Sequence, residues 1–475
     1  MKSALVIIML ISGMCIPAGG FAQSRQQQKT DSVFRLIINY SKTHDADAIY
    51  NLADSDYKKS ISQARFRDFL FRGLFSNPIK RDSLVSFVNN LIATYKIELG
   101  DAKMQLTLGL DDDNKFNYFG LGPYKVVATN KSTRAASNNP LKSATDKIVD
   151  SIARRYIQKI TTVGLSIGVI KGGIISTYNY GETKKGSGQL PTPATIYEVG
   201  SISKTFTATL LAWFVNEDKV SLSDPITKYL PDSVAANPAL KGITLVNLSN
   251  HTSGLNGLPS NFESQKNYQE SNPYKNYTRD QLFTYLKTCT LRSEPGKKYA
   301  YSNLAVGLLG IILERVSGKP YEQLVTEIIC KPLGLKSTVQ HISPLLAARF
   351  APVYDENAVE TSAWDFDALA ACGSIRSDIT DLLLYAKANM VPANTKLYKA
   401  FELTHQITLH TEPQVGLGWH IIKADGVSYY FHNGGTGGSR SFLAYNAEKG
   451  LIVILLSNAD VSTDGVGVEI LKKLQ

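Results

Sequence analysis

Cysteine is scarce in this chain, which has 4 cysteines among 475 residues. One of them, Cys15, lies in an apolar N-terminal stretch, so the body of the chain holds Cys289, Cys330 and Cys372. These three lack the CxxC spacing of a zinc site and are too few for a disulfide scaffold. We expect buried free thiols and no bound metal, with one disulfide as the alternative in an oxidising compartment.

The body of the chain also lacks long apolar runs and clusters of basic residues. No segment after the N-terminal stretch has about 20 uninterrupted apolar residues, so we expect no stable membrane insertion. The formal net charge is +10, but the lysines stand singly or in pairs such as Lys184-Lys185. This distribution favours an evenly basic surface over a nucleic-acid-binding patch. A hydrophobic content of 43% fits a globular protein, and a length of 475 residues predicts two domains.

Residues 1–22 have the pattern of a secretory signal peptide. Lys2 supplies the positive start, Ala4 to Ile16 supplies the apolar stretch, and Gly20-Phe21-Ala22 carries the small residues that a signal peptidase recognises. Cleavage after Ala22 would leave Gln23 as the first residue. The sequence therefore predicts a periplasmic or secreted protein.

Residues 23–128 are expected to form a small α+β domain. Apolar residues recur at helical spacing within 33–38 and 66–74. Met104 to Leu110 then alternates as a half-buried strand, and the alternation resumes at Phe116 after a turn, which predicts a hairpin. This order of elements loosely resembles the cone-shaped nuclear-transport-factor-like modules that can precede exported bacterial hydrolases.

A second domain is expected over residues 144–475, after a linker at 129–143 that is rich in Asn, Ser, Ala and Lys. Strand patterns occur at its start, from Val163 to Tyr180, and at its end, from Trp419 to Leu456. The middle, from Ser201 to about Met390, is rich in helical patterns. This order predicts an α+β fold in which one antiparallel sheet is built from both ends of the domain, with an inserted helical region.

The most informative stretch is Ser201-Ile202-Ser203-Lys204, which lies between Gly200 and an apolar run typical of a buried helix. We expect Ser201 at the helix N-terminus, where free N–H groups favour developing negative charge, and Lys204 one turn further on the same face. A serine beside a desolvated amine can attack a carbonyl near neutral pH. Taken alone, however, the string also fits a capping serine followed by a solvated lysine.

Two further strings bear on this choice. Tyr301-Ser302-Asn303 precedes an apolar helix, and its tyrosine is either a structural cap or a group that takes the proton of Ser201 and returns it to a leaving group. The amide of Asn303 can bind a substrate carbonyl. His432-Asn433-Gly434-Gly435 ends a predicted strand, where glycines let a substrate backbone approach, although a glycine-rich turn explains this string better when it is taken alone.

These three strings occur in order and in matching structural contexts. Here residues 140–475 resemble the serine β-lactamase and penicillin-binding-protein-like superfamily, which includes class C β-lactamases, DD-carboxypeptidases, D-aminopeptidases and esterases. The resemblance extends to six other segments, namely Gly164-Leu165-Ser166, Leu222-Ser223-Asp224-Pro225, Lys228-Tyr229-Leu230-Pro231, His251-Thr252-Ser253-Gly254-Leu255, Ala371-Cys372-Gly373-Ser374-Ile375 and Gly416-Leu417-Gly418-Trp419.

The resemblance implies an exported serine hydrolase that forms an acyl-enzyme on Ser201 and needs no metal or other cofactor. Lys204 and Tyr301 would share the acid–base work, in a division that the sequence leaves open. The backbone N–H groups of Ser201 and Gly435 would form the oxyanion hole. The implied substrate-binding residues are Asn303, His432, Gly434 and Gly435. The implied partner is a small molecule or a peptide, with peptidoglycan-derived peptides among the candidates, and the oligomeric state stays open.

One motif departs from the class C pattern, which has Lys-Thr-Gly where this chain has His432-Asn433-Gly434. Lysine offers a substrate carboxylate a fixed positive charge, whereas histidine does so only when it is protonated. We therefore expect hydrolysis of an amide or ester of the DD-peptidase, D-aminopeptidase or esterase type. A class C-like β-lactamase and a non-catalytic ligand-binding receptor are the alternatives.

Two other patterns are assigned structural roles. Gly164-Leu165-Ser166-Ile167-Gly168 matches the G-x-S-x-G elbow of α/β-hydrolases, but Ser166 lies inside an apolar strand and not at a strand-to-helix turn. His251 is expected to support its loop. His405 and His410 lack a third ligand for a metal.

Overall fold

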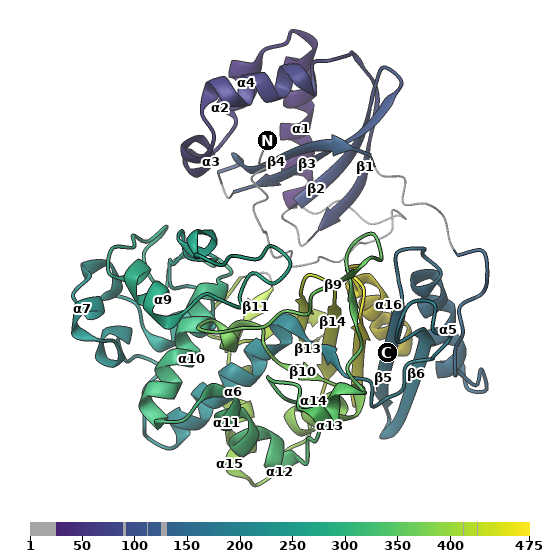
Figure 1. Cartoon of the computed structure of the whole chain (residues 1–475), viewed down its shortest axis with the longest axis vertical. Helices are drawn as coiled ribbons and strands as arrows, with labels where there is room; N and C mark the ends of the chain where they lie inside the picture. Colours follow the sequence, from purple (N-terminus) through teal and green to yellow (C-terminus); the bar gives the residue numbers. More distant parts are fainter. Residues whose placement is uncertain (1–24, 89–91, 112, 125–130, 412, 425) are drawn as a thin grey trace. The chain divides into compact units, whose positions relative to one another are not determined.

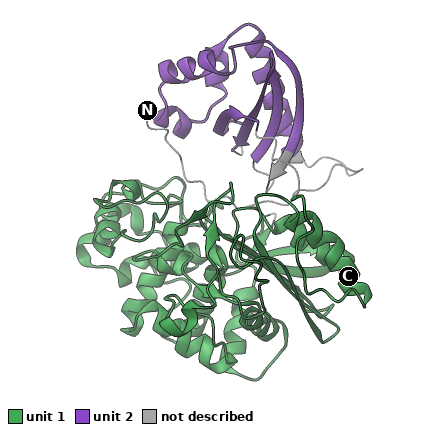
Figure 2. Cartoon of the chain, turned by 45° about the vertical axis from the view of Figure 1, so that its right-hand side comes forward, with its two compact units in different colours: residues 1–9, 130–475 green, residues 10–129 purple. Residues whose placement is uncertain are grey.

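The computed structural model of the chain describes residues 25–88, 92–111, 113–124, 131–411, 413–424 and 426–475. The predicted signal peptide and its cleavage site after Ala22 lie outside these residues. The chain divides into two compact units with the boundary between Thr129 and Asn130. In chain order, the first unit is purple in Figure 2 and the second unit is green. Within the part of the chain that the structure describes, no helix is both long and apolar enough to cross a membrane.

The first unit combines four helices with a four-stranded antiparallel sheet of order β1-β2-β3-β4 (Figure 1). Its elements are α1 (Arg25–Lys42), α2 (Ala46–Asn51), α3 (Ser55–Ser60), α4 (Gln63–Arg72), β1 (Ile79–Val88), β2 (Ile92–Leu99), β3 (Ala102–Leu110) and β4 (Phe116–Pro123). The side chains of Asp45, Asp54 and Ser62 cap the N-termini of α2, α3 and α4. In the core, the ring of Phe34 stacks on that of Tyr95 at a centroid distance of 3.6 Å.

The sequence patterns identified only the β3–β4 hairpin of this sheet, so β1 and β2 were missed. In β2, buried residues alternate with partly exposed ones along the whole strand, and Tyr95 and Ile97 belong to the core of this unit. The signal was therefore present in the sequence. Lys96 and Glu98 occupy the intervening positions and interrupt the apolar character of the strand.

The second unit is built on a seven-stranded antiparallel sheet of order β11-β12-β13-β14-β15-β5-β6. Its strands are β5 (Gly164–Lys171), β6 (Ile174–Gly181), β11 (Gln414–Val415), β12 (His420–Ala424), β13 (Val427–Gly435), β14 (Arg440–Asn446) and β15 (Leu451–Ser457). β15 pairs with β5 in a register that runs from Leu451 opposite Lys171 to Ser457 opposite Leu165. This pairing joins the two ends of the domain and confirms the predicted fold.

Helices cover both faces of this sheet (Figure 1). α5 (Ala144–Ile157) and α16 (Asp464–Leu474) share a core with one face, and α14 (Ile379–Met390) contributes to the core on the other. Successive side chains of β14 point to opposite faces of the sheet. Phe442 therefore belongs to the core shared with α5 and α16, and Leu443 to the core shared with α14. Ser143 caps α5 in a reciprocal capping box with Asp146.

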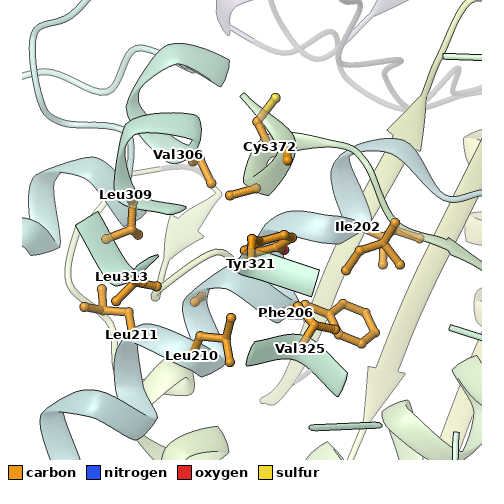
Figure 3. Close-up of a cluster of buried hydrophobic side chains, with 14 of the residues drawn as sticks. Ile202, Phe206, Leu210, Leu211, Val306, Leu309, Leu313, Tyr321, Val325 and Cys372 are labelled. Carbon is orange, nitrogen blue, oxygen red and sulfur yellow. The ribbon is translucent and has the colours of Figure 1, made fainter. Parts of the chain in front are cut away.

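The inserted region contains two helices that are buried on almost every side, α6 (Ser203–Asn216) and α10 (Asn303–Ser317). Figure 3 shows side chains of both helices together with Tyr321 and Val325 in one apolar cluster. Helices that are apolar all round belong in the interior of a domain. Their N-terminal ends are therefore held by packing, and these ends carry Lys204 and Asn303.

Shorter elements complete the unit. They are β7 (Tyr197–Glu198), α7 (Asp232–Ala235), α8 (Leu245–Ser249), α9 (Arg279–Leu286), α11 (Tyr321–Leu324), α12 (Lys331–Leu333), α13 (Pro344–Ala347), β8 (Val353–Tyr354), β9 (Glu360–Thr361), β10 (Arg376–Ser377) and α15 (Lys396–His405). β7 pairs with β10 in a separate two-stranded sheet directly before the segment that carries Ser201.

The segment predicted as a linker is bonded to the second unit from Lys131 onward. Its backbone exchanges hydrogen bonds with α5 and β6, such as Lys131 N–H to the Gln158 carbonyl at 2.7 Å and Gly181 N–H to the Ala136 carbonyl at 2.9 Å. The side chain of Asn139 also donates to the Tyr180 hydroxyl at 2.8 Å. The three cysteines outside the N-terminal stretch are free and buried.

Candidate active site

Ser201 lies in a tight turn that leads into α6. Gly200 has a φ of +50°, a left-handed conformation that favours glycine, and Gly200–Ile202 form a 3₁₀ turn. α6 begins only at Ser203, so Ser201 precedes the α-helix, whereas the sequence predicted it on the newly started helix. The left-handed entry at Gly200 causes this difference, because it tightens the chain ahead of the first α-helical turn. The Ser201 residue is 9% exposed.

The Lys204 ammonium is the centre of the site's hydrogen bonding. Its Nζ donates to Ser201 Oγ at 3.0 Å, to Asn303 Oδ1 at 2.7 Å and to the Cys372 carbonyl at 2.7 Å. These acceptors match the three N–H donors of an ammonium group. Burial lowers the pKa of Lys204 to about 8, because the charged form is desolvated. The amine can therefore lose its proton near neutral pH.

Tyr301 contacts the same serine from the other side. Its hydroxyl donates to Ser201 Oγ at 2.7 Å, and Lys204 Nζ lies 4.8 Å from the centroid of its ring. Burial raises the pKa of Tyr301 well above its ordinary value. The resting side chain is thus a phenol that donates a hydrogen bond, and not the phenolate that was considered from the sequence.

His251 supports the loop that carries Tyr301. Its Nδ1 accepts a hydrogen bond from the Ser302 N–H at 3.2 Å, and its ring centroid lies 4.4 Å from that of Tyr301. The loop is also fixed by Ser302, whose hydroxyl accepts from the Ala305 N–H and caps α10. These contacts agree with the structural role expected for His251.

Asn303 is held by a residue that the sequence did not single out. While its Oδ1 accepts from Lys204, its Nδ2 donates to the Tyr274 hydroxyl at 3.1 Å. Tyr274 is buried, and its ring stacks on that of Phe366 at 4.5 Å. No motif marks Tyr274, which is one of 24 tyrosines and lies in an irregular segment.

The end of β13 runs against the turn of Ser201. A Cβ on Gly434 would lie 2.1 Å from the Val199 carbonyl oxygen and 2.9 Å from the Ser201 nitrogen, so only glycine allows this approach. A Cβ on Gly200 would likewise lie 2.7 Å from the Gly435 nitrogen. The two backbone N–H groups predicted to form an oxyanion hole therefore belong to segments in direct contact.

The register of the sheet orients the N–H of Gly435. β12 pairs with β13 only as far as Phe431, whereas β14 pairs with it through Gly435. Thr436 N–H donates to the Ser439 carbonyl at 3.0 Å, so the next pair, Gly435 with Arg440, is a non-hydrogen-bonded pair. The N–H of Gly435 therefore points away from β14, toward the side of β13 that β12 leaves open.

His432 lies three residues before Gly435 in β13 and is buried. Its Nδ1 donates to the Asn433 carbonyl at 2.6 Å, and its Nε2, an acceptor in that tautomer, has no partner among the described residues. Burial, with His420 and Lys204 nearby, lowers the pKa of His432 well below its ordinary value. His432 is thus neutral near pH 7. His420, which the sequence analysis did not single out, lies 5.2 Å away between ring centroids.

The remaining candidates lie in structural surroundings. Ser166 is inside β5, and its hydroxyl shares a hydrogen bond of 3.0 Å with the hydroxyl of Tyr197. His405 Nε2 shares one of 2.6 Å with the hydroxyl of Tyr445. Across the described ranges, no three His, Cys, Asp or Glu side chains are grouped so that they could hold a metal ion.

Known proteins are similar to this chain over most of its second unit. A sequence model of the family described as Beta-lactamase matches residues 149–474. A "Beta-lactamase" of Pseudomonas fluorescens is 32% identical over 359 residues, which are 66% of this chain and 94% of that protein. The "D-alanyl-D-alanine-carboxypeptidase/endopeptidase AmpH" of Escherichia coli K12 is 32% identical over 320 residues, 63% of this chain and 80% of that protein.

A solved structure has the same fold. The "Beta-Lactamase/D-Alanine Carboxypeptidase from Pseudomonas syringae" superimposes with a TM-score of 0.63 at 25% identity, over 70% of this chain and 100% of that one. The residues matched by the family model, 149–474, lie in the second unit and include all the site residues described above. The chain therefore belongs to the beta-lactamase family, within the serine β-lactamase and penicillin-binding-protein-like superfamily that its three motifs resemble.

Proposed function

We propose that this chain is a serine hydrolase that cleaves an amide or an ester through an acyl-enzyme on Ser201. The observation that carries the proposal is the convergence of Lys204 Nζ and Tyr301 Oη on Ser201 Oγ, at 3.0 and 2.7 Å. A serine needs a neighbouring base to attack a carbonyl, and both groups are within reach for proton transfer.

The proposed attack begins when Lys204 loses its proton. The neutral amine then accepts the Ser201 hydroxyl proton, while the Tyr301 phenol keeps its hydrogen bond to the oxygen that becomes the nucleophile. Because burial holds the pKa of Tyr301 well above its ordinary value, the phenol stays protonated and can pass its proton to the leaving group. Lys204 then returns a proton to Tyr301 through a water, which restores the resting protonation of both groups.

The N–H groups of Ser201 and Gly435 would stabilise the tetrahedral intermediate. The Gly435 N–H points to the open side of β13, and the segment that carries it touches the Ser201 turn. A donor in this position is worth about 3 kcal/mol of transition-state stabilisation in acyl transfer. A substrate acyl group lying along residues 432–435 would place its carbonyl oxygen between the two donors.

His432 bears on the substrate class. A neutral imidazole with a free acceptor nitrogen gives a substrate carboxylate no positive charge. We therefore favour a substrate without a carboxylate next to the scissile bond, as in D-aminopeptidases and esterases, or a peptide whose carboxylate is bound elsewhere. A β-lactamase activity is the second candidate, because a relative 32% identical over 94% of its length carries that name.

Acylation of the purified protein tests the proposal. Intact-mass spectrometry after exposure to a fluorophosphonate and to a fluorescent penicillin should show one adduct, localised to Ser201. Ser201→Ala should lose it, whereas the matched control Ser203→Ala should keep it, because the Ser203 hydroxyl only accepts the Ile375 N–H at 3.0 Å. An adduct that persists in Ser201→Ala, or wild type that no probe acylates and that turns over no substrate, contradicts the proposal.

Turnover rates separate the substrate classes. We expect a short-chain nitrophenyl ester or a D-amino-acid peptide to be hydrolysed with a higher kcat/KM than a chromogenic cephalosporin. The opposite order would favour the β-lactamase alternative.

Export is proposed on the N-terminal pattern of residues 1–22. Expression of the full chain in a Gram-negative host should release a protein from the periplasm whose N-terminal sequence starts at Gln23. Retention of the uncleaved chain in the cytoplasm would contradict the export proposal without affecting the proposed chemistry.

A further inference from the structure

A buried carboxylate lies three positions before Ser201 and is not used by the proposed chemistry. Glu198 is 3% exposed. Its Oε1 accepts the Trp364 N–H at 2.6 Å, and its Oε2 accepts the Thr436 hydroxyl at 2.6 Å. Glu198 lies in β7, which leads to Ser201, and Thr436 directly follows Gly435. Their hydrogen bond therefore connects the segments that carry the two predicted oxyanion donors, the N–H groups of Ser201 and Gly435.

The carboxylate is compensated on its other side by Arg376. The guanidinium Nη2 donates to the Trp364 carbonyl at 2.7 Å and to Asp365 Oδ1 at 3.2 Å, and it lies 3.9 Å from Glu198 Oε1, so the charge of Arg376 is shared between the two carboxylates. Arg376 and Glu198 are also paired residues of β10 and β7. A buried ion pair costs desolvation that an apolar pair of similar size avoids. An apolar residue at position 198 could not make the two hydrogen bonds to Trp364 and Thr436.

Thr436 connects Glu198 to the turn that follows Gly435. Its Oγ donates to Glu198 and accepts from the Ser439 N–H at 3.2 Å, while its carbonyl accepts from Arg440 Nη1 at 2.8 Å. The turn that ends β13 is thus stabilised by hydrogen bonds among its own residues. The bond from the Thr436 hydroxyl to the Glu198 carboxylate attaches it to β7. A separate bond, from the Ser441 hydroxyl to the Val199 carbonyl at 2.8 Å, secures β14 to the same segment.

We propose that Glu198 is a positioning residue that, through Thr436, fixes the Gly435 N–H at the correct separation from the Ser201 N–H. The inference rests on the proposed acyl transfer at Ser201 and assigns a new role within that site. Oxyanion donors act only when they are preorganised at the position of the developing charge. A misplacement of about 1 Å in a catalytic group costs about 100-fold in rate. Loss of the bond should therefore lower kcat and leave substrate binding largely intact.

Thr436→Val is the sharpest perturbation, because it removes the hydroxyl and keeps the volume. We expect kcat for a nitrophenyl ester to fall roughly 10- to 100-fold, with KM changed less than about threefold. The affinity for a boronic acid that forms a tetrahedral adduct on Ser201 should fall by a similar factor. Thr436→Ser keeps the hydroxyl and should restore kcat to within about threefold of wild type. Glu198→Leu, which removes both acceptor oxygens, should reproduce the Thr436→Val loss, and the double variant should add little to it.

Tyr178→Phe is the matched control. It removes another buried hydroxyl–carboxylate bond, from Tyr178 to Asp146 at 2.8 Å, on the opposite face of the sheet. It should lower the unfolding temperature about as much as Thr436→Val and leave kcat unchanged. A Thr436→Val variant with wild-type kcat and boronate affinity overturns the inference, as does a loss that Thr436→Ser fails to restore. Wild type that is never acylated at Ser201 overturns the proposed function and this inference with it.

Discussion

The pH dependence of acylation tests the role assigned to Lys204. Its pKa is lowered by burial from 10.5 to about 8, so the neutral amine, the form that accepts the serine proton, is populated within an accessible range. At pH 6, 7 and 8 the neutral fraction is about 1%, 10% and 50%. The acylation rate constant should therefore rise about tenfold per pH unit below 8 and level off above it. With an unshifted amine the rate would still be rising at pH 10.

The measurement is the second-order rate constant for modification of Ser201 by a nitrophenyl ester or a fluorophosphonate, from pH 5.5 to 10. Tyr301→Phe separates the two candidates for the base. If Lys204 is the base, the variant should keep the apparent pKa near 8 with a plateau roughly 100-fold lower. If the Tyr301 phenolate is the base, the limb near pH 8 should disappear in the variant. A flat wild-type profile from pH 6 to 9, or a rise that continues through pH 10, would refute the reasoning.

Three further expectations follow from the same structure. The pKa of Lys204 is lower in the folded than in the unfolded chain, so its buried charge destabilises the fold below pH 8. Between pH 7 and pH 10, the free energy of unfolding of wild type should therefore rise by about 2–3 kcal/mol relative to that of Lys204→Met, as measured by denaturant titration. An unchanged difference between the two proteins would contradict the pKa shift. Gly434→Ala places a Cβ 2.1 Å from the Val199 carbonyl oxygen and should lower both the unfolding temperature and the acylation rate. Its control, Gly465→Ala in α16, has nothing within 4 Å of the new Cβ and should keep full activity, with a gain of about 0.5–1 kcal/mol; equal behaviour of the two variants would argue against the close approach at Gly434. His432→Lys should raise the ratio of cephalosporin to ester kcat/KM about tenfold if this position faces the substrate carboxylate, and an unchanged ratio would place the carboxylate elsewhere.

Local patterns predicted much of the second unit. The strands from β12 to β15 and the hairpin of β5 and β6 follow from short-range alternation and turn residues, and the structure has them within a few residues of the expected ranges. The three strings around Ser201, Tyr301 and His432 supplied the predicted site residues. Four of these are joined by hydrogen bonds in the structure: Lys204 bonds to Ser201 and Asn303, and Tyr301 bonds to Ser201. Spacing within each string, together with the order of the strings, carries this information.

The parts that were not predicted depend on contacts between distant segments. Tyr274 reaches Asn303 from an irregular segment, and Glu198 bonds to Thr436 across 238 positions of the chain. A single tyrosine or glutamate has no periodicity that would mark it. The neutral state of His432 likewise arises from burial and from His420, which only the folded chain provides.

The junction of β15 with β5 has a consequence for how the protein comes to be active. The Ser457 hydroxyl bonds to the Gly164 carbonyl across 293 positions of sequence, and β15 lies between β14 and β5 in the sheet. Contacts of such separation form late and slowly, because a long loop must close before any of them is gained. The approach of β13 to the Ser201 turn spans a similar length of chain, so the Gly435 N–H can lie beside Ser201 only after β13 has been synthesised. Ser201 is therefore synthesised long before the proposed site can assemble, so the proposed hydrolase activity requires the last strands of the chain.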